Sequence, residues 1–94
     1  MRILQIIDSL DIGGAEKMAV NYANSLSERI EFSGIIVTRK EGPLKNQVLK
    51  NVSYLFLRRK KTIDFKAIFK LRKYCIENRI EYLHPHSNSY FTAV

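Results

Sequence analysis

The sequence predicts an α/β fold built on a Rossmann-like parallel sheet with flanking helices. Short apolar runs alternate with helical segments, which is the pattern of βαβ units. The first run is followed by two glycines and a helix, and polar residues follow the last run. Both loops therefore belong at the edge formed by the carboxyl ends of the strands, where such sheets bind ligands. We expect residues 1–94 to form one such domain, with right-handed crossovers.

The first 40 residues predict two strands around one helix. Residues 2–7 are almost continuously apolar, as in a strand that is covered on both faces of a parallel sheet. Residues 31–38 have the β-branched centre that favours a second strand. Between them we expect a loop over residues 8–14 and a helix over residues 15–28. The helix face expected to be buried consists of Ala15, Met18, Ala19, Tyr22 and Leu26.

The remaining residues predict two more strands. Gly42-Pro43 interrupts the chain, and Pro43 favours the start of a short helix that ends near residue 49. Residues 52–57 and residues 80–83 are short apolar runs that we interpret as the third and fourth strands.

A second long helix is expected over residues 65–78, because Asp64 can cap its N-terminus. Arg72 falls inside the apolar arc of this helix, so we expect its side chain to snorkel along the helix surface. A further helix is expected to begin near Tyr90. The buried stripe of the second helix is expected to comprise Phe65, Ile68, Phe69, Leu71, Cys75 and Ile76.

The composition, 46% hydrophobic and 27% charged, is that of a globular domain. No apolar run reaches the roughly 18 residues of a membrane-spanning helix. The N-terminus lacks the apolar core and the cleavage site of a signal peptide. Cys75 is the only cysteine, so the chain forms no internal disulfide, which fits a reducing cytoplasm. We expect its thiol to be packed and unreactive.

The net charge of +7 comes from one segment of the chain. Residues 58–73 contain all of the excess positive charge, and the rest of the chain is balanced. One interpretation is a solvated loop and helix face, and a second is contact with anionic lipid headgroups. A third is binding of an anionic acceptor such as a sugar phosphate. Nucleic acid is not expected as a partner, because no aromatic stacking platform accompanies the basic residues.

Gly13 and Gly14 precede the first helix, where backbone N–H groups and the helix dipole favour an anionic ligand. The alternative is a tight strand-to-helix turn that requires positive φ. The segment has neither the G-x-G-x-x-G pattern of dinucleotide-binding proteins nor the G-K-[ST] of a P-loop.

His84 and His86 are expected to lie on one side of an extended segment, because they are two residues apart. Three interpretations are open for this pair. The first is a role in an active site, the second is one packed and one surface histidine, and the third is a metal site formed by both. The metal interpretation lacks an obvious third ligand.

Two segments resemble the retaining glycosyltransferases of the GT-B fold, in the family called family 4 or group 1. Residues 1–26 begin with Met-Arg-Ile-Leu and contain Gly-Gly-Ala-Glu, like that family's first strand, loop and helix. Residues 80–89 contain His-Pro-His-Ser and resemble the family pattern I-D-[IV]-[IV]-H-x-H-[ST], with Glu81 after Ile80 where Asp is usual. The two segments occur in the order that the family shows.

The resemblance implies a binding site for a nucleotide-sugar donor. Gly13, Gly14 and Glu16 are then expected to bind the donor. His86 is expected to be catalytic and to face the donor sugar and its diphosphate. His84 is expected to be structural, at the buried end of the strand. Because protein groups stabilise the leaving group in this family, the resemblance implies no metal and no other cofactor.

The implied activity is transfer of a hexose-type sugar, with retention, to a saccharide or lipid-linked acceptor, as in polysaccharide synthesis. The protein is then expected in the cytoplasm, peripherally at the inner face of the membrane. The family's C-terminal domain, with its E-x7-E motif, would lie beyond Val94, and the chain without that domain is expected to be inactive. Acceptor or membrane contacts are expected from Arg58, Arg59, Lys60, Lys61 and Asn88.

Two other interpretations stay open at this point. The chain is either a non-catalytic α/β module that binds an anionic small molecule or a partner protein, or part of a GT-B-like sugar-nucleotide epimerase. An E-x7-E motif downstream favours transfer over both alternatives.

Overall fold

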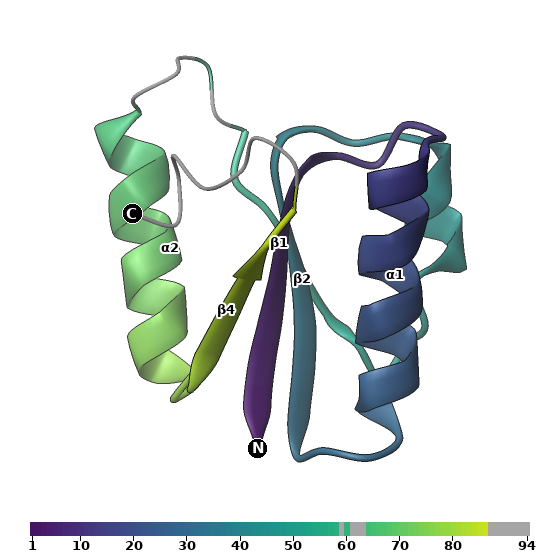
Figure 1. The fold of residues 1–94 in the computed structure, drawn as a ribbon. Helices are drawn as coiled ribbons and strands as arrows, with labels where there is room; N and C mark the ends of the chain where they lie inside the picture. The colour runs from purple at the N-terminus through teal and green to yellow at the C-terminus, as the bar shows by residue number, and fades with distance from the viewer. Residues whose placement is uncertain (59, 61–63, 87–94) are drawn as a thin grey trace.

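The computed structural model describes residues 1–58, 60 and 64–86. Its four strands form one all-parallel sheet in the order β3-β2-β1-β4 (Figure 1). The expected α/β, Rossmann-like class is therefore confirmed. The strands are β1 (Arg2–Ser9), β2 (Phe32–Lys40), β3 (Ser53–Phe56) and β4 (Tyr82–Pro85). The helices are α1 (Gly14–Ser27), the 3₁₀ helix η1 (Pro43–Gln47) and α2 (Phe65–Glu77).

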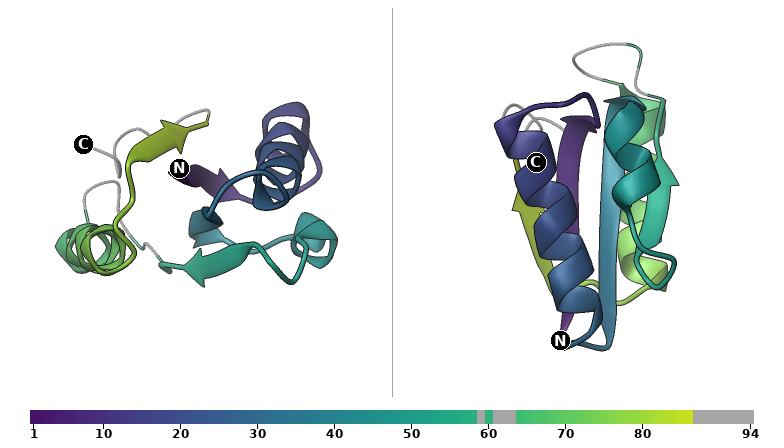
Figure 2. Two further views of the ribbon diagram at one scale, coloured as in Figure 1. Left: turned by 90° about the horizontal axis from the view of Figure 1, so that it is seen from below. Right: turned by 90° about the vertical axis from the view of Figure 1, so that its right-hand side faces the viewer.

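The helices cover opposite faces of the sheet (Figure 2). Helices α1 and η1 lie over one face, and α2 lies over the other, so the sheet is buried on both sides. This arrangement explains why β1 and β2 are apolar almost throughout. The core under α1 contains Ile7, Leu10, Ala19, Val20, Ala23, Ile35, Val37, Leu44 and Val52. The core under α2 contains Leu4, Ile6, Ile36, Leu57, Ala67 and Leu71.

The face of α1 that packs on the sheet differs from the expected one. Ala19, Val20 and Ala23 are buried, whereas Met18 and Tyr22 are exposed. Small side chains at Ala19 and Ala23 let the helix backbone approach the sheet closely. The larger side chains of Met18 and Tyr22 are thereby turned to the flank of the contact.

The expected buried stripe of α2 is wrong for its largest side chains. Ala67 and Leu71 are buried, while Phe65, Phe69 and Ile76 are 69%, 66% and 68% exposed. The helix again packs through the row that contains its small residue. Arg72 is exposed, and the snorkelling of its side chain along the helix surface stays a prediction. Of the expected stripe, Leu71 is buried, and Ile68 and Cys75 are partly buried.

The termini of α2 follow known capping rules. Asp64 caps the helix as expected, because its Oδ1 accepts a hydrogen bond of 3.2 Å from the Ala67 N–H. At the other end Arg79 has a φ of 51°, and the Ile80 N–H donates to the Cys75 carbonyl. Because Ile80 still belongs to this cap, β4 begins at Tyr82 and not at residue 80.

Candidate functional site

The order of the strands reverses at β1. The chain runs from β1 to β2 and β3 on one side, and then crosses behind the sheet through α2 to reach β4 on the other side. The carboxyl ends of β1 and β4 are therefore neighbours at the top of Figure 1. In open α/β sheets this switch point is where a crevice forms and ligands bind. The glycine loop follows β1, and His86 follows β4, so both lie at this point.

The glycine loop does not use the positive φ that a tight turn was expected to require. Gly13 is the N-cap of α1 with an extended φ of −171°, and no described glycine has positive φ. A Cβ at Gly13 would lie 2.7 Å from Oε1 of Glu16, so a larger residue there would require the flexible Glu16 side chain to move. Gly14 faces open space.

The carboxylate of Glu16 changes what this loop can bind. It lies in the first turn of α1 and folds back against Gly13. A negative charge at this position suits the helix dipole but repels a second anion. Glu16 is therefore better suited to accept hydrogen bonds from hydroxyl groups than to sit beside a diphosphate.

A second glycine holds this loop in place. A Cβ on Gly42 would lie 2.5 Å from the backbone of Leu10 and Asp11, so only glycine allows the two segments to pack. The Leu44 N–H donates to the Leu10 carbonyl at 3.0 Å, and Lys40 forms a 3.2 Å ion pair with Asp11. The segment after β2 thereby supports the loop after β1.

His86 is anchored inside the fold by Gln5. The imidazole Nε2 lies 2.8 Å from Oε1 of Gln5, and the two residues are 7% and 1% exposed. The His86 backbone N–H donates to the Ile6 carbonyl at 2.8 Å, which continues the pairing of β4 with β1. Because a carbonyl oxygen accepts, this contact places a proton on Nε2 of His86.

His84 and His86 lie on one side of the segment, as their spacing predicts. Their ring centroids are 4.3 Å apart, and the Tyr22 ring of α1 lies 5.7 Å from His84 and 6.2 Å from His86. The buried position that the resemblance implied for His84 is wrong, because His84 is exposed and His86 is buried, which agrees with the alternative of one packed and one surface histidine. β4 is an edge strand in the described sheet and leaves His84 uncovered, whereas His86 turns inward over Gln5.

The surroundings of His86 keep its ring uncharged near neutral pH. Burial lowers the pKa of His86, and the neighbouring His84 lowers it further. A neutral imidazole is a hydrogen-bonding group and not a counter-ion. The same effect of burial raises the pKa of the Cys75 thiol, in line with the packed cysteine expected under α2.

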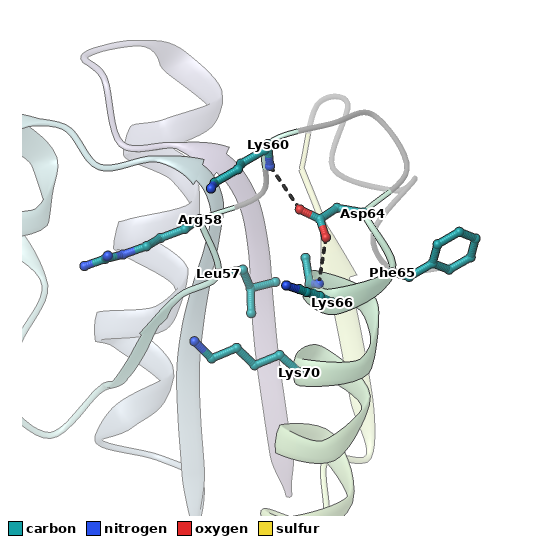
Figure 3. Close-up of a pocket in the computed structure, with 8 residues that line it drawn as sticks. Leu57, Arg58, Lys60, Asp64, Phe65, Lys66 and Lys70 are labelled. Carbon is teal, nitrogen blue, oxygen red and sulfur yellow. Dashed lines mark hydrogen bonds between the residues drawn. The ribbon is translucent and has the colours of Figure 1, made fainter.

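A separate cavity of about 620 Å³ lies between the end of β3 and the first two turns of α2 (Figure 3). Lys60, Lys66 and Lys70 extend toward the same side of α2, around Leu57, while the Phe65 ring points the other way. Asp64 also lines the cavity, but its two oxygens accept from the backbone N–H groups of Lys60 and Ala67. The lining is completed by Arg58, whose φ of 57° is left-handed.

The structure brings only some of the expected site residues together. Gly13, Gly14 and Glu16 lie at the carboxyl edge with His86, while Arg58 and Lys60 line the separate cavity. Arg59, Lys61 and Asn88, and the helix expected near Tyr90, lie outside the described residues.

Sequence reasoning missed Gln5, Lys66 and Lys70 as site residues. A polar residue in the middle of the apolar run Ile-Leu-Gln-Ile-Ile was the signal for Gln5, because buried polar groups need partners. Lys66 and Lys70 are one helical turn apart, which places them on one face.

Two further features of the described residues bear on the class of site. Within residues 1–58, 60 and 64–86, no group of three His, Cys, Asp or Glu side chains is placed to hold a metal ion. In the same part of the chain, neither α1 nor α2 has the length and hydropathy needed to cross a bilayer.

The fold and the site define an α/β protein with a parallel sheet and polar groups at its switch point. Comparison with known proteins does not extend this class. No protein-family model, no curated protein and no solved structure matches the chain.

Proposed function

We propose that this chain forms the acceptor-side domain of a retaining glycosyltransferase that uses a nucleotide-sugar donor. The observation that supports the proposal is the position of His86. It is buried, bonded to Gln5, and next to the end of the strand that leads into the Gly13-Gly14 loop. Groups at neighbouring strand ends can contact one small ligand in the crevice of such a sheet. The acceptor in this proposal is a saccharide or a lipid-linked saccharide.

The charges at the switch point favour the sugar of the donor as their ligand over its diphosphate. Glu16 carries a negative charge at the start of α1, and the lowered pKa of His86 keeps that ring neutral. Carboxylates and neutral imidazoles bind hydroxyl groups well and stabilise a diphosphate poorly. We therefore assign the donor's sugar hydroxyls to His86 and Glu16, and the diphosphate to a second domain of the enzyme.

The proposed role of His86 is to orient the donor sugar during transfer. The nucleoside diphosphate leaves with the electron pair of the glycosidic bond, and the acceptor oxygen forms the new bond and gives its proton to the departing diphosphate. A sugar held in one orientation loses less entropy on reaching this transition state. The buried Gln5 contact fixes the ring of His86 and makes it a rigid contact for a hydroxyl.

Steady-state turnover of the enzyme that contains this domain tests the proposal. His86→Ala is expected to lower kcat/KM roughly 100-fold, as expected when a positioned hydrogen bond to the reacting group is lost. This substitution also leaves Gln5 without its partner, so folding is measured by circular dichroism in parallel. Ser33→Ala is a matched control, because the buried Ser33 hydroxyl donates to the Ala23 carbonyl at the amino end of the sheet. Turnover of folded His86→Ala within threefold of the wild type, or equal losses in both variants, contradicts the role.

We also propose that the protein is cytoplasmic and contacts the anionic inner face of the membrane. Phe65, Phe69 and Ile76 are exposed on α2 beside the basic residues Lys66, Lys70 and Lys73. Apolar and basic residues on one helix are the combination found in helices that lie in the membrane interface.

Sedimentation with vesicles tests the membrane contact. The wild type is expected to sediment with vesicles that contain phosphatidylglycerol, and Phe65→Ser/Phe69→Ser is expected to stay in solution. Ile12→Ser/Leu49→Ser removes two other exposed apolar side chains and should bind like the wild type. Equal binding by all three proteins, or none by the wild type, rules out this surface.

A further inference from the structure

We infer that the cavity between β3 and α2 binds a phosphate monoester, at a site separate from the switch point that the proposed transferase function uses. The inference does not depend on that function. It starts from the three ammonium groups of Lys60, Lys66 and Lys70, which extend toward one side of α2 around the cavity (Figure 3).

The ammonium groups of these three lysines are not held in ion pairs by the described carboxylates, unlike those of three other surface lysines. Lys40, Lys45 and Lys73 form ion pairs with Asp11, Glu41 and Glu77 at distances of 3.2, 2.9 and 3.8 Å. Within the described ranges 1–58, 60 and 64–86, no ion pair is formed by Lys60, Lys66 or Lys70. Their charges are therefore available to an anion from outside.

Among the described residues of the lining, the negative charge of Asp64 offsets one of the basic residues and leaves an excess of positive charge. Asp64 turns both oxygens to backbone N–H groups, at 3.1 Å from Lys60 and 3.2 Å from Ala67. Its carboxylate is thus used to cap α2 and to fix the backbone of Lys60. The inference accordingly rests on the lysine side chains and the cavity, and not on the end of the helix, which Asp64 already caps.

The size and charge of the cavity select the kind of anion. A volume of about 620 Å³ lies in the range of small-molecule sites. Several ammonium groups bind a phosphate monoester better than a carboxylate or sulfonate of similar shape, because the monoester carries close to two negative charges at neutral pH. The methylene stems of the lysines and the side chain of Leu57 offer apolar surface that an apolar substituent on the phosphate can contact.

The backbone at Arg58 supports a built site at this position. Its left-handed φ of 57° is unfavourable for a residue with a side chain, and such strain is concentrated where a chain must present particular groups. Arg58 directly follows the buried Leu57, and both residues line the cavity.

Titration with phenyl phosphate, followed through the backbone amides of residues 64–70 by NMR, tests the inference. Saturable shifts are expected, and benzenesulfonate, which has a similar shape but one charge, is expected to bind roughly tenfold more weakly. Lys66→Gln/Lys70→Gln is expected to weaken phenyl phosphate binding at least tenfold. Lys17→Gln/Lys50→Gln removes the same charge from exposed positions elsewhere and is expected to bind like the wild type.

A vesicle experiment then distinguishes the two sources of such a phosphate. If vesicles with phosphatidic acid bind more tightly than vesicles with phosphatidylglycerol, and the difference depends on Lys66 and Lys70, the ligand is a lipid headgroup. If the two kinds of anionic vesicle bind equally while phenyl phosphate binds at the cavity, the ligand is a soluble phosphate. Absence of saturable shifts, equal binding of benzenesulfonate, or equal losses in the two double variants overturns the inference.

Discussion

The two ligand-binding regions that we propose are built on opposite principles. At the switch point, Gln5 and His86 are buried and neutral and are bonded to each other. At the cavity, Lys60, Lys66 and Lys70 are exposed and charged, and their ammonium groups form no ion pair with the described acidic residues. The first region couples its chemistry to folding, because a buried polar group left without its partner destabilises the protein. The second does not, because water solvates its charges whether or not a ligand is present.

Of the changes that test this comparison, Gln5→Leu is expected to have the largest effect on the free energy of unfolding. The substitution keeps the volume of the side chain but removes the acceptor for Nε2 of His86. The free energy of unfolding should fall by about 1–3 kcal/mol, which is the cost of a buried donor without a partner. Urea denaturation followed by circular dichroism measures it. The double variant Gln5→Leu/His86→Leu is the control and should recover part of the loss. If the single variant is as stable as the wild type, the buried pair is not coupled to folding.

A change of pH is expected to have a smaller effect on the free energy of unfolding, through the protonation of His86. Burial lowers the pKa of His86 in the folded state below its ordinary value of 6.5, so the unfolded chain binds more protons as the pH falls. The contribution to stability is complete above pH 6.5 and is lost as the pH falls through the folded-state pKa. Between about pH 7.5 and about pH 5, the wild type should therefore lose more unfolding free energy than His86→Gln. Parallel curves for the two proteins would show that His86 titrates as it does in the unfolded chain.

Substitutions of the cavity lysines are expected to have the smallest effect on the free energy of unfolding. Lys66→Gln/Lys70→Gln should change the free energy of unfolding by less than about 0.5 kcal/mol, because solvated surface charges contribute little to stability. Urea denaturation at low salt measures the change, and Lys17→Gln/Lys50→Gln is the control of equal charge. A loss of stability well above that of the control would mean that the lysines hold the fold together and are not reserved for a ligand.

The order and type of the strands and helices could be predicted from the sequence, because each β-strand is short, apolar and bounded by turn residues. The helix faces could not. Apolarity identifies Phe65 and Phe69 as buried, but α2 packs through Ala67 and Leu71, which let it lie close to the sheet. Which row of a helix contacts a sheet depends on how closely the backbones approach, and this is a property of the assembled layers.

The site was predictable to a similar degree. The spacing of His84 and His86 places them on one side, but which of them is buried depends on the register of β4 against β1. Gln5 becomes a site residue only because that register brings His86 over it. The charge run was visible, whereas the grouping of Lys60 with Lys66 and Lys70 depends on Asp64 ending the loop and starting α2.

The left-handed backbone at Arg58 has a consequence for how this protein responds to selection. Arg79 has the same backbone conformation at the end of α2, away from the cavity. Glycine relieves such strain at either position, so a search for thermostable variants should accept Arg79→Gly readily. At Arg58 the same exchange changes the backbone that lines the cavity, and improved stability would be accompanied by weaker ligand binding. A lineage that retains arginine at residue 58 while it varies residue 79 would therefore record selection on the ligand and not on the fold.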